Sequence, residues 1–81
     1  MTITVFSKPD CRQCTATKNW LKKRGQDFVE RDISQDTDAR DVALSMGFTS
    51  APVVTVRNDN GGLEDSWGGL NPGKLHQWVG K

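Results

Sequence analysis

The first 33 residues alternate between two periodicities, and this alternation limits the available folds more than any other feature. Residues 2–6, TITVF, are rich in β-branched side chains and predict a strand. Residues 12–24 carry apolar side chains at helical spacing and stop before Gly25, a residue typical of helix C-caps. Residues 27–33 predict a second strand. Two strands joined by a helix are expected to lie parallel in one sheet.

A second helix is predicted after residue 33. Ser34 or Asp36 can cap its first turn, and Gly47 follows its last apolar residue. The spacing i, i+3, i+4 and i+7 is typical of a helix with one buried face, and here it is occupied by Ala39, Val42, Ala43 and Met46.

The rest of the chain predicts a hairpin and one more helix. Strands are expected over 52–57 and 63–67, and the turn-forming sequence NDNGG separates them. Asn71 followed by Pro72 is typical of a helix start. The order β-α-β-α-β-β-α predicts an α/β fold in which a mixed four-stranded sheet packs against three helices.

Length and charge argue against several domains and against nucleic-acid binding. The 81 residues are expected to form one domain, 1–81, with a small core. Eleven Lys and Arg balance ten Asp and Glu, and this near-neutral total argues against a nucleic-acid-binding protein. No 18-residue apolar run predicts a membrane span, and no secretion signal is recognisable at the start of the chain. A cytoplasmic location is therefore expected.

Both cysteines of the chain lie in the sequence DCRQC, at positions 11 and 14. Two thiols at this spacing can hold a metal, form a structural disulfide or cycle between dithiol and disulfide. A structural bridge is disfavoured, because the cytoplasm keeps thiols reduced and the loop that it would close is short. A zinc site normally needs four Cys or His ligands, and His76 on a distant helix is the only histidine. No metal is therefore expected.

The position of this motif favours redox chemistry. Cys11 is expected at the first turn of the helix, where unpaired N–H groups and the positive helix end favour a thiolate. Cys14 is three residues further on the same helix face, so it can reach Cys11 and resolve a mixed disulfide. Because Cys14 shares the apolar face with Thr17 and Leu21, we expect it to be the more buried thiol. Cys11 and Cys14 are the predicted catalytic pair.

Taken together, the motifs resemble one family of thioredoxin-fold proteins. CxxC at the first helix and the strand-opening Pro52 are typical of redoxins. Within these, CRQCTATK (11–18), SAPVV (50–54) and WGGLNP (67–72) resemble the NrdH-redoxins, whose motifs are CVQCTATK, APVV and WSGFRPD. The resemblance covers essentially the whole chain and implies a thioredoxin-like, glutaredoxin-like fold. It also implies a cis Ala51–Pro52 bond, which sequence patterns alone do not predict.

The resemblance implies a function as well. NrdH-redoxins look like glutaredoxins but behave like thioredoxins: they carry electrons from NADPH, through thioredoxin reductase, to class Ib ribonucleotide reductase. By this resemblance the partners are thioredoxin reductase and the large subunit of that ribonucleotide reductase. The chain is expected to be a monomer without a bound cofactor, because NADPH and flavin act through the reductase.

Several positions depart from the family motifs. Arg12 replaces valine between the cysteines, and of the third motif only Trp67, Gly69 and Pro72 remain. Arg12 is expected to be either a solvated helix-start arginine or a docking contact for an acidic partner. Trp67 is expected either in the core or beside the substrate groove. The residues expected to bind substrate or partner are Arg12, Gln13, Ala51, Pro52, Trp67, Gly68 and Gly69.

A glutathione-dependent dithiol glutaredoxin is the alternative. Gly68 and Gly69 match the Gly-Gly pair of glutaredoxins, but the acid that follows it there is replaced by Asn71 or Pro72. Gln13 stands where the CPYC motif of glutaredoxins has an aromatic residue. The missing carboxylate would weaken binding of a glutathione amino group by about 1–3 kcal/mol. The sequence therefore favours the thioredoxin-like alternative.

Overall fold

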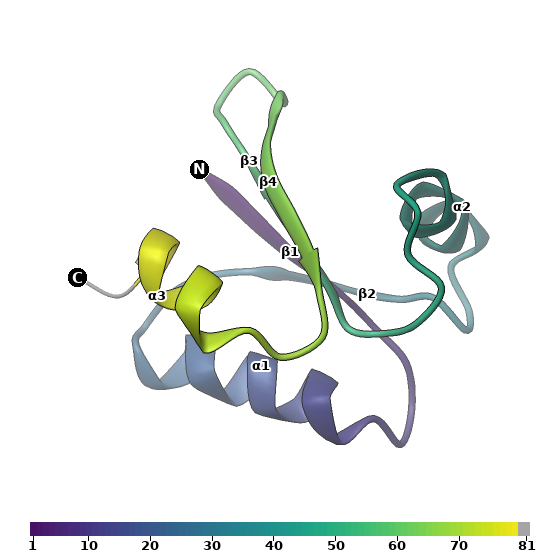
Figure 1. Ribbon diagram of the computed structural model, residues 1–81, viewed down its shortest axis with the longest axis horizontal. Coiled ribbons are helices and arrows are strands. Elements are labelled where there is room, and N and C mark those ends of the chain that lie inside the picture. Colours follow the sequence, from purple (N-terminus) through teal and green to yellow (C-terminus); the bar gives the residue numbers. More distant parts are fainter. Residues whose placement is uncertain (80–81) are drawn as a thin grey trace.

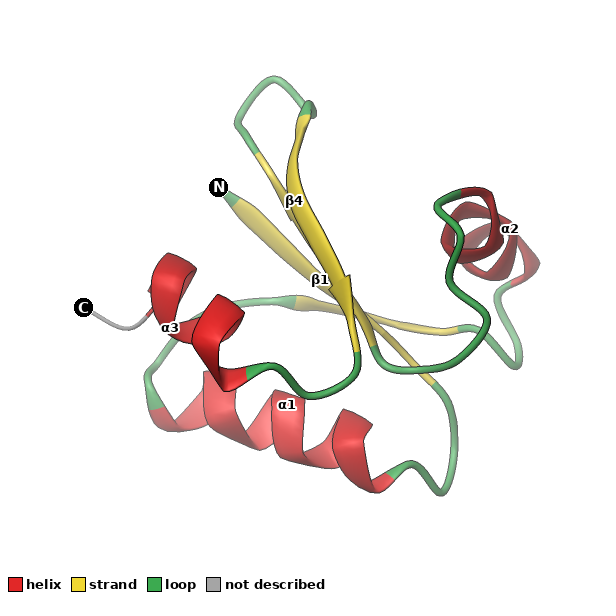
Figure 2. Cartoon of the chain, in the orientation of Figure 1, coloured by secondary structure: helices red, strands yellow, loops and turns green. Residues whose placement is uncertain are grey.

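The elements follow one another in the order that the sequence predicts. The structure, a computed structural model, describes residues 1–79. Its elements are β1 (Thr2–Ser7), α1 (Arg12–Lys23), β2 (Val29–Asp32), α2 (Thr37–Ser45), β3 (Val53–Arg57), β4 (Leu63–Gly68) and α3 (Pro72–Val79). Figure 1 shows the path of the chain through them, and Figure 2 separates helices, strands and loops by colour.

A mixed four-stranded sheet in the order β2-β1-β3-β4 forms the centre of the domain. β1 pairs with β2 in parallel, with Thr4 opposite Val29. β3 pairs antiparallel with β1 and with β4. The predicted α/β class, the parallel pair and the hairpin are therefore confirmed.

Helices cover both faces of the sheet, so the core has two parts. α1 and α3 lie on one side of the sheet and α2 on the other (Figure 1). On the α1 and α3 side the buried residues are Ile3, Val5, Leu21, Val54, Val56, Trp67 and Leu75. On the α2 side they are Phe6, Ala39, Ala43 and Val53. Successive residues of β1 and β3 supply both parts, because side chains alternate between the faces of a strand.

Local interactions settle where the elements begin and end. Asp36 rather than Ser34 caps α2, and its carboxylate accepts a hydrogen bond from the Ala39 N–H at 3.0 Å. Asn71 caps α3 through the Lys74 N–H, as predicted. The predicted strand over 27–33 is too long, because pairing with β1 begins only at Val29.

Asp65 fastens α3 to the sheet. Its Oδ2 on β4 accepts hydrogen bonds from Lys74 Nζ and Trp78 Nε1 of α3, each at 2.9 Å. These two bonds hold the pKa of the Asp65 carboxyl below its ordinary value of 3.8. A carboxyl with a lowered folded-state pKa stabilises the fold above its unfolded-state pKa. That stabilisation is lost as the pH falls through the folded-state value.

Asp65→Asn is therefore expected to lower the free energy of unfolding at neutral pH by about 1 kcal/mol. The difference from the unsubstituted protein should begin to shrink as the pH falls below the ordinary value of 3.8 and should vanish only below the lowered folded-state pKa of Asp65. Urea unfolding at a series of pH values measures both quantities. Asp59→Asn is the control, because the Asp59 side chain is 94% exposed and, among residues 1–79, pairs only with the amino terminus. An Asp65→Asn difference that is constant from neutral to acid pH would contradict this assignment.

Candidate active site

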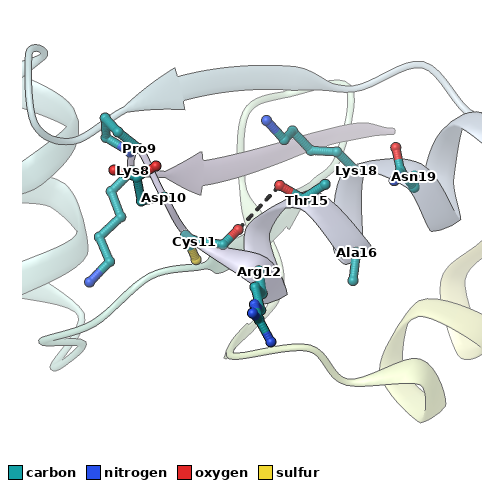
Figure 3. A pocket seen from close by; sticks show the side chains of 9 residues that line it. All are labelled: Lys8, Pro9, Asp10, Cys11, Arg12, Thr15, Ala16, Lys18 and Asn19. Carbon is teal, nitrogen blue, oxygen red and sulfur yellow. Dashed lines mark hydrogen bonds between the residues drawn. The ribbon is translucent and has the colours of Figure 1, made fainter.

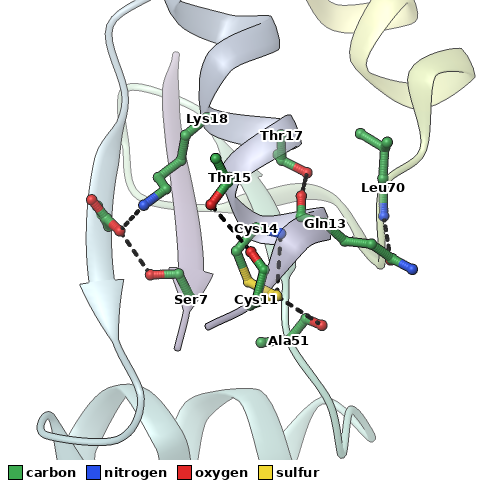
Figure 4. The surroundings of a disulfide bond; sticks show 10 residues. Ser7, Cys11, Gln13, Cys14, Thr15, Thr17, Lys18, Ala51 and Leu70 are labelled. Carbon is green, nitrogen blue, oxygen red and sulfur yellow. Dashed lines mark hydrogen bonds and ion pairs between the residues drawn. A yellow bond between two sulfur atoms is a disulfide. The ribbon is translucent and has the colours of Figure 1, made fainter. Parts of the chain in front are cut away.

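The two cysteines lie where the loop after β1 enters α1. They form a disulfide with Cα atoms 5.2 Å apart (Figure 4). Cys14 is 1% exposed and belongs to the buried face of α1 with Thr17 and Leu21, whereas Cys11 is half-buried. The expectation that Cys14 is the more buried thiol is confirmed. Only Cys11 is reached from solvent to any extent.

Cys11 is itself the N-cap of α1. Its backbone is extended, and its Sγ accepts a hydrogen bond from the Cys14 N–H at 3.2 Å. The carbonyl of Cys11 accepts from both the N–H and the hydroxyl of Thr15. Asp10, just before the cap, has a φ of 56°, a conformation that aspartate tolerates better than most residues. The Cys11 sulfur thus faces an N–H group and the positive end of a helix, both of which stabilise negative charge on it.

A second segment approaches Cys11 from the loop before β3. The Ala51–Pro52 bond is cis, as the family resemblance implies, and Cys11 Sγ lies 3.8 Å from the Ala51 carbonyl oxygen. Pro52 is less than 2% exposed, and its carbonyl accepts the Gly69 N–H at 2.8 Å. The Pro52 ring is therefore not available for contact with a partner, and its role is to fix the backbone conformation beside the disulfide.

Gln13 joins the cysteine motif to the loop between β4 and α3. Its side-chain Oε1 accepts a hydrogen bond from the Leu70 N–H at 3.1 Å (Figure 4), and the Thr17 hydroxyl donates to its carbonyl at 2.8 Å. Gln13 is exposed, and sequence reasoning missed this contact. No local pattern predicts it, because the two residues are 57 positions apart.

Steric limits and backbone conformation restrict positions 68 and 69 to glycine. A Cβ at Gly68 would lie 3.2 Å from the Phe48 ring, and Gly69 has a φ of +78°. A Cβ at Gly69 would lie 3.2 Å from Gln13 Oε1. Both positions therefore favour glycine for reasons within this fold.

The seven residues expected to contact a partner fall into two groups. Arg12, Gln13 and Gly68 are exposed, and Ala51 and Gly69 are partly so. Pro52 and Trp67 are buried, and the Trp67 side chain packs in the core formed with α1 and α3. Trp67 therefore takes the first of its two expected positions. The sequence could not predict the burial of Pro52, because it depends on how distant segments pack around that residue.

A carboxylate near α1 also escaped the sequence reasoning. Glu30 Oε2 accepts a hydrogen bond from Lys18 Nζ at 2.7 Å and another from the buried Ser7 hydroxyl at 2.9 Å (Figure 4). These bonds, the one from Lys18 first, hold the pKa of Glu30 below its ordinary value. A helix-surface lysine such as Lys18 ordinarily points into solvent. The register of β2 against β1 brings Glu30 within its reach.

Other binding chemistry has little support within the described chain. Residues 1–79 contain no group of three or more His, Cys, Asp or Glu that could hold a metal ion. His76 is exposed on α3. Over the same residues, none of the helices is both long and apolar enough to cross a membrane.

The chain is similar to known proteins over most of its length. A profile of the glutaredoxin family matches residues 3–60. The glutaredoxin-like protein NrdH of Escherichia coli K12 is 34% identical over 77 residues, which cover 95% of this chain and 88% of that protein. The NrdH protein of Lactococcus lactis subsp. cremoris is 38% identical over 53 residues, 65% of this chain and 74% of its own.

A solved structure supports the same assignment. The NrdH-redoxin of E. coli, a glutaredoxin-like protein described as having a thioredoxin-like activity profile, superposes with a TM-score of 0.81. The two share 32% identity, and the match covers 95% of this chain and 93% of that one. The chain therefore belongs to the glutaredoxin family, among the glutaredoxin-like NrdH proteins, and is a thiol–disulfide oxidoreductase with a thioredoxin-like fold.

Proposed function

We propose that this chain carries electrons from NADPH, through thioredoxin reductase, to the large subunit of a class Ib ribonucleotide reductase. The observation that carries the proposal is the Cys11–Cys14 disulfide at the start of α1, in a chain similar to NrdH proteins over nearly its full length. The carrier acts as a cytoplasmic monomer. It needs no bound cofactor, because the two cysteines themselves hold the electron pair.

Cys11 is the proposed nucleophile. In the dithiol form its thiolate attacks one sulfur of the acceptor disulfide, and the other acceptor sulfur leaves as a thiolate. The Cys14 N–H and the α1 amino terminus stabilise the attacking thiolate. Cys11 suits this step because it is the more exposed of the two sulfurs.

Cys14 completes the exchange. Its thiolate attacks Cys11 in the mixed disulfide, forms the Cys11–Cys14 bond and releases the second acceptor thiolate. Two electrons pass to the acceptor, and two protons complete its thiols. The reductase returns two electrons from NADPH to the Cys11–Cys14 disulfide and so closes the cycle.

The site also supports the choice of thioredoxin reductase over glutathione. Two successive N–H groups of the glycine loop, those of Gly69 and Leu70, already bind Pro52 and Gln13. They are therefore occupied and less able to bind a carboxylate of a small thiol. Asn71, one of the two residues that can stand where glutaredoxins have the acid, uses its side chain to cap α3. Steric limits within the fold already explain glycine at positions 68 and 69, so this pair is not evidence for a glutathione site.

Two parallel coupled assays test the reductant. One contains NADPH, thioredoxin reductase and a model protein disulfide; the other contains NADPH, glutathione, glutathione reductase and the same disulfide. We expect turnover in the first and little in the second. Dithiothreitol in place of either reductase is the control that the protein is active. Turnover only with glutathione would overturn the proposed reductant, and the protein would be a glutathione-dependent glutaredoxin.

The acceptor is tested separately. Deoxyribonucleotide formation by a purified class Ib ribonucleotide reductase is expected to continue beyond a single turnover only when the carrier, thioredoxin reductase and NADPH are all present. The Cys11→Ser variant supplies the matched control. Turnover that is independent of the carrier, or unchanged with the variant, would overturn this part of the proposal.

A further inference from the structure

A groove of about 710 Å³ lies beside Cys11, and its lining residues do not include the glycine loop, residues 68–70. It runs from the loop before α1 along the first turns of that helix (Figure 3). Cys11 lines it and Cys14 does not. A partner segment that presents a disulfide to Cys11 can therefore lie in this groove.

Lys8 and Arg12 give the groove a positive character. Figure 3 shows their side chains extending on either side of the Cys11 sulfur, while the side chain of Asp10 lies beside Pro9. Within residues 1–79, the side chains of Lys8 and Arg12 form neither a hydrogen bond nor an ion pair.

Lys18, the third cation of the groove, differs because Glu30 neutralises it at 2.7 Å. Lys8 and Arg12 thus leave two cations beside the reactive sulfur, against the single carboxylate among the lining residues, that of Asp10, in a chain whose formal net charge is only +1.

We propose that Lys8 and Arg12, called here the Lys8–Arg12 surface, dock an acidic peptide segment, one in which carboxylates flank the disulfide cysteine. The inference rests on the proposed thiol–disulfide exchange and names the chemistry of the segment that it recognises. A guanidinium matches a carboxylate with paired hydrogen bonds, and the lysine adds a second point charge. Two cations are too few for a nucleic-acid backbone.

The chemistry restricts which step the surface affects. Docking precedes the attack of the Cys11 thiolate, so complementary charge raises the second-order rate of mixed-disulfide formation. Resolution by Cys14 is intramolecular and uses atoms already in contact, so its first-order rate does not change. Salt screens these exposed charges, so the rate advantage of acidic over basic segments must fall as ionic strength rises.

Three disulfide peptides test the surface. They are identical except that the two residues flanking the cysteine are both Glu, both Gln or both Lys. The fully reduced protein is mixed with each, and its oxidation is followed at about 20 mM and about 500 mM salt, where the Debye lengths differ several-fold. The second-order rate should be about 10-fold higher for the Glu peptide than for the Lys peptide at low salt, and the two should converge at high salt.

Charge reversal assigns the preference to the surface. Arg12→Glu and Lys8→Glu should each reduce the preference for the Glu peptide, and the double variant should reverse it. For each variant the rates with the charged peptides are divided by its rate with the Gln peptide, so that any change in the Cys11 thiolate itself cancels from the preference. Lys23→Glu, the matched control, makes the same change in net charge at the exposed far end of α1 and should keep the original order.

Each other outcome overturns a defined statement. Equal rates for the three peptides at low salt, or equal effects of Lys23→Glu and Arg12→Glu, would overturn the Lys8–Arg12 surface while leaving the exchange chemistry in place. Failure of the reduced protein to react even with the Gln peptide would instead overturn the proposed thiol–disulfide exchange. Circular dichroism of each variant confirms that the comparison is made between folded proteins.

Discussion

Replacing Cys11 by serine is expected to abolish disulfide reduction, with a loss of roughly 10³-fold or more in turnover. The variant has no nucleophile at the exposed position, and the buried Cys14 cannot take its place. The fold should survive, because serine is a favoured N-cap and its hydroxyl oxygen can accept the hydrogen bond from the Cys14 N–H. Reduction of a model protein disulfide in the thioredoxin reductase assay measures the effect.

Cys14→Ser should separate the two steps of the exchange. Its Cys11 thiolate can still attack, but the mixed disulfide has no internal thiol to resolve it and should accumulate with the partner. Mass spectrometry after acid quenching detects this species. The reduced unsubstituted protein is the reference for folding, since neither variant can form the internal disulfide. Full dithiol turnover by Cys11→Ser, or stable adducts with Cys11→Ser instead of Cys14→Ser, would contradict the assigned roles.

Leu21→Ala should have the largest effect on stability. Leu21 is 0% exposed and lies in the core between α1 and the sheet. Truncation of a buried leucine leaves a cavity and typically lowers the free energy of unfolding by about 2–5 kcal/mol. The free energy of unfolding of a native protein is only about 5–15 kcal/mol, so this substitution should remove a large part of it.

Urea unfolding of the oxidised protein measures this loss. Leu44→Ala is a matched control, because it makes the same change on helix α2 at a position that is 48% exposed. Its effect should remain within about 0.5 kcal/mol. Similar losses for the two variants would show that helix propensity, rather than burial, accounts for the effect.

The secondary structure was largely readable from the chain because its signals are local. β-branched runs predict β1 and β3, and the spacing of Cys14, Thr17 and Leu21 predicts the buried face of α1. The predicted strand over 27–33 is too long because local composition does not show where pairing with a neighbouring strand begins. Its composition suits a strand throughout, but β2 extends only as far as β1 can pair with it.

Some features of the candidate site follow from local sequence, and others do not. CxxC at the start of a helix specifies the reactive pair, because the unpaired N–H groups and positive end of a helix come with the element itself. The contacts of Gln13 with Leu70, of Glu30 with Lys18 and Ser7, and of Pro52 with Gly69 do not follow from any local pattern. The cis Ala51–Pro52 bond was expected only through family resemblance.

What this sequence determined by itself is therefore the order of the elements, the positions of Cys11 and Cys14 and the more buried character of Cys14. Each depends on residues within a few positions of one another. The tertiary structure alone decided that Pro52 and Trp67 are buried and that Gln13 binds the loop before α3. It also decided that, within the described residues 1–79, Lys8 and Arg12 remain unpaired beside Cys11 while Lys18 does not. These features depend on how the sheet register and helix packing bring distant segments together. Packing of this kind is a property of the whole fold.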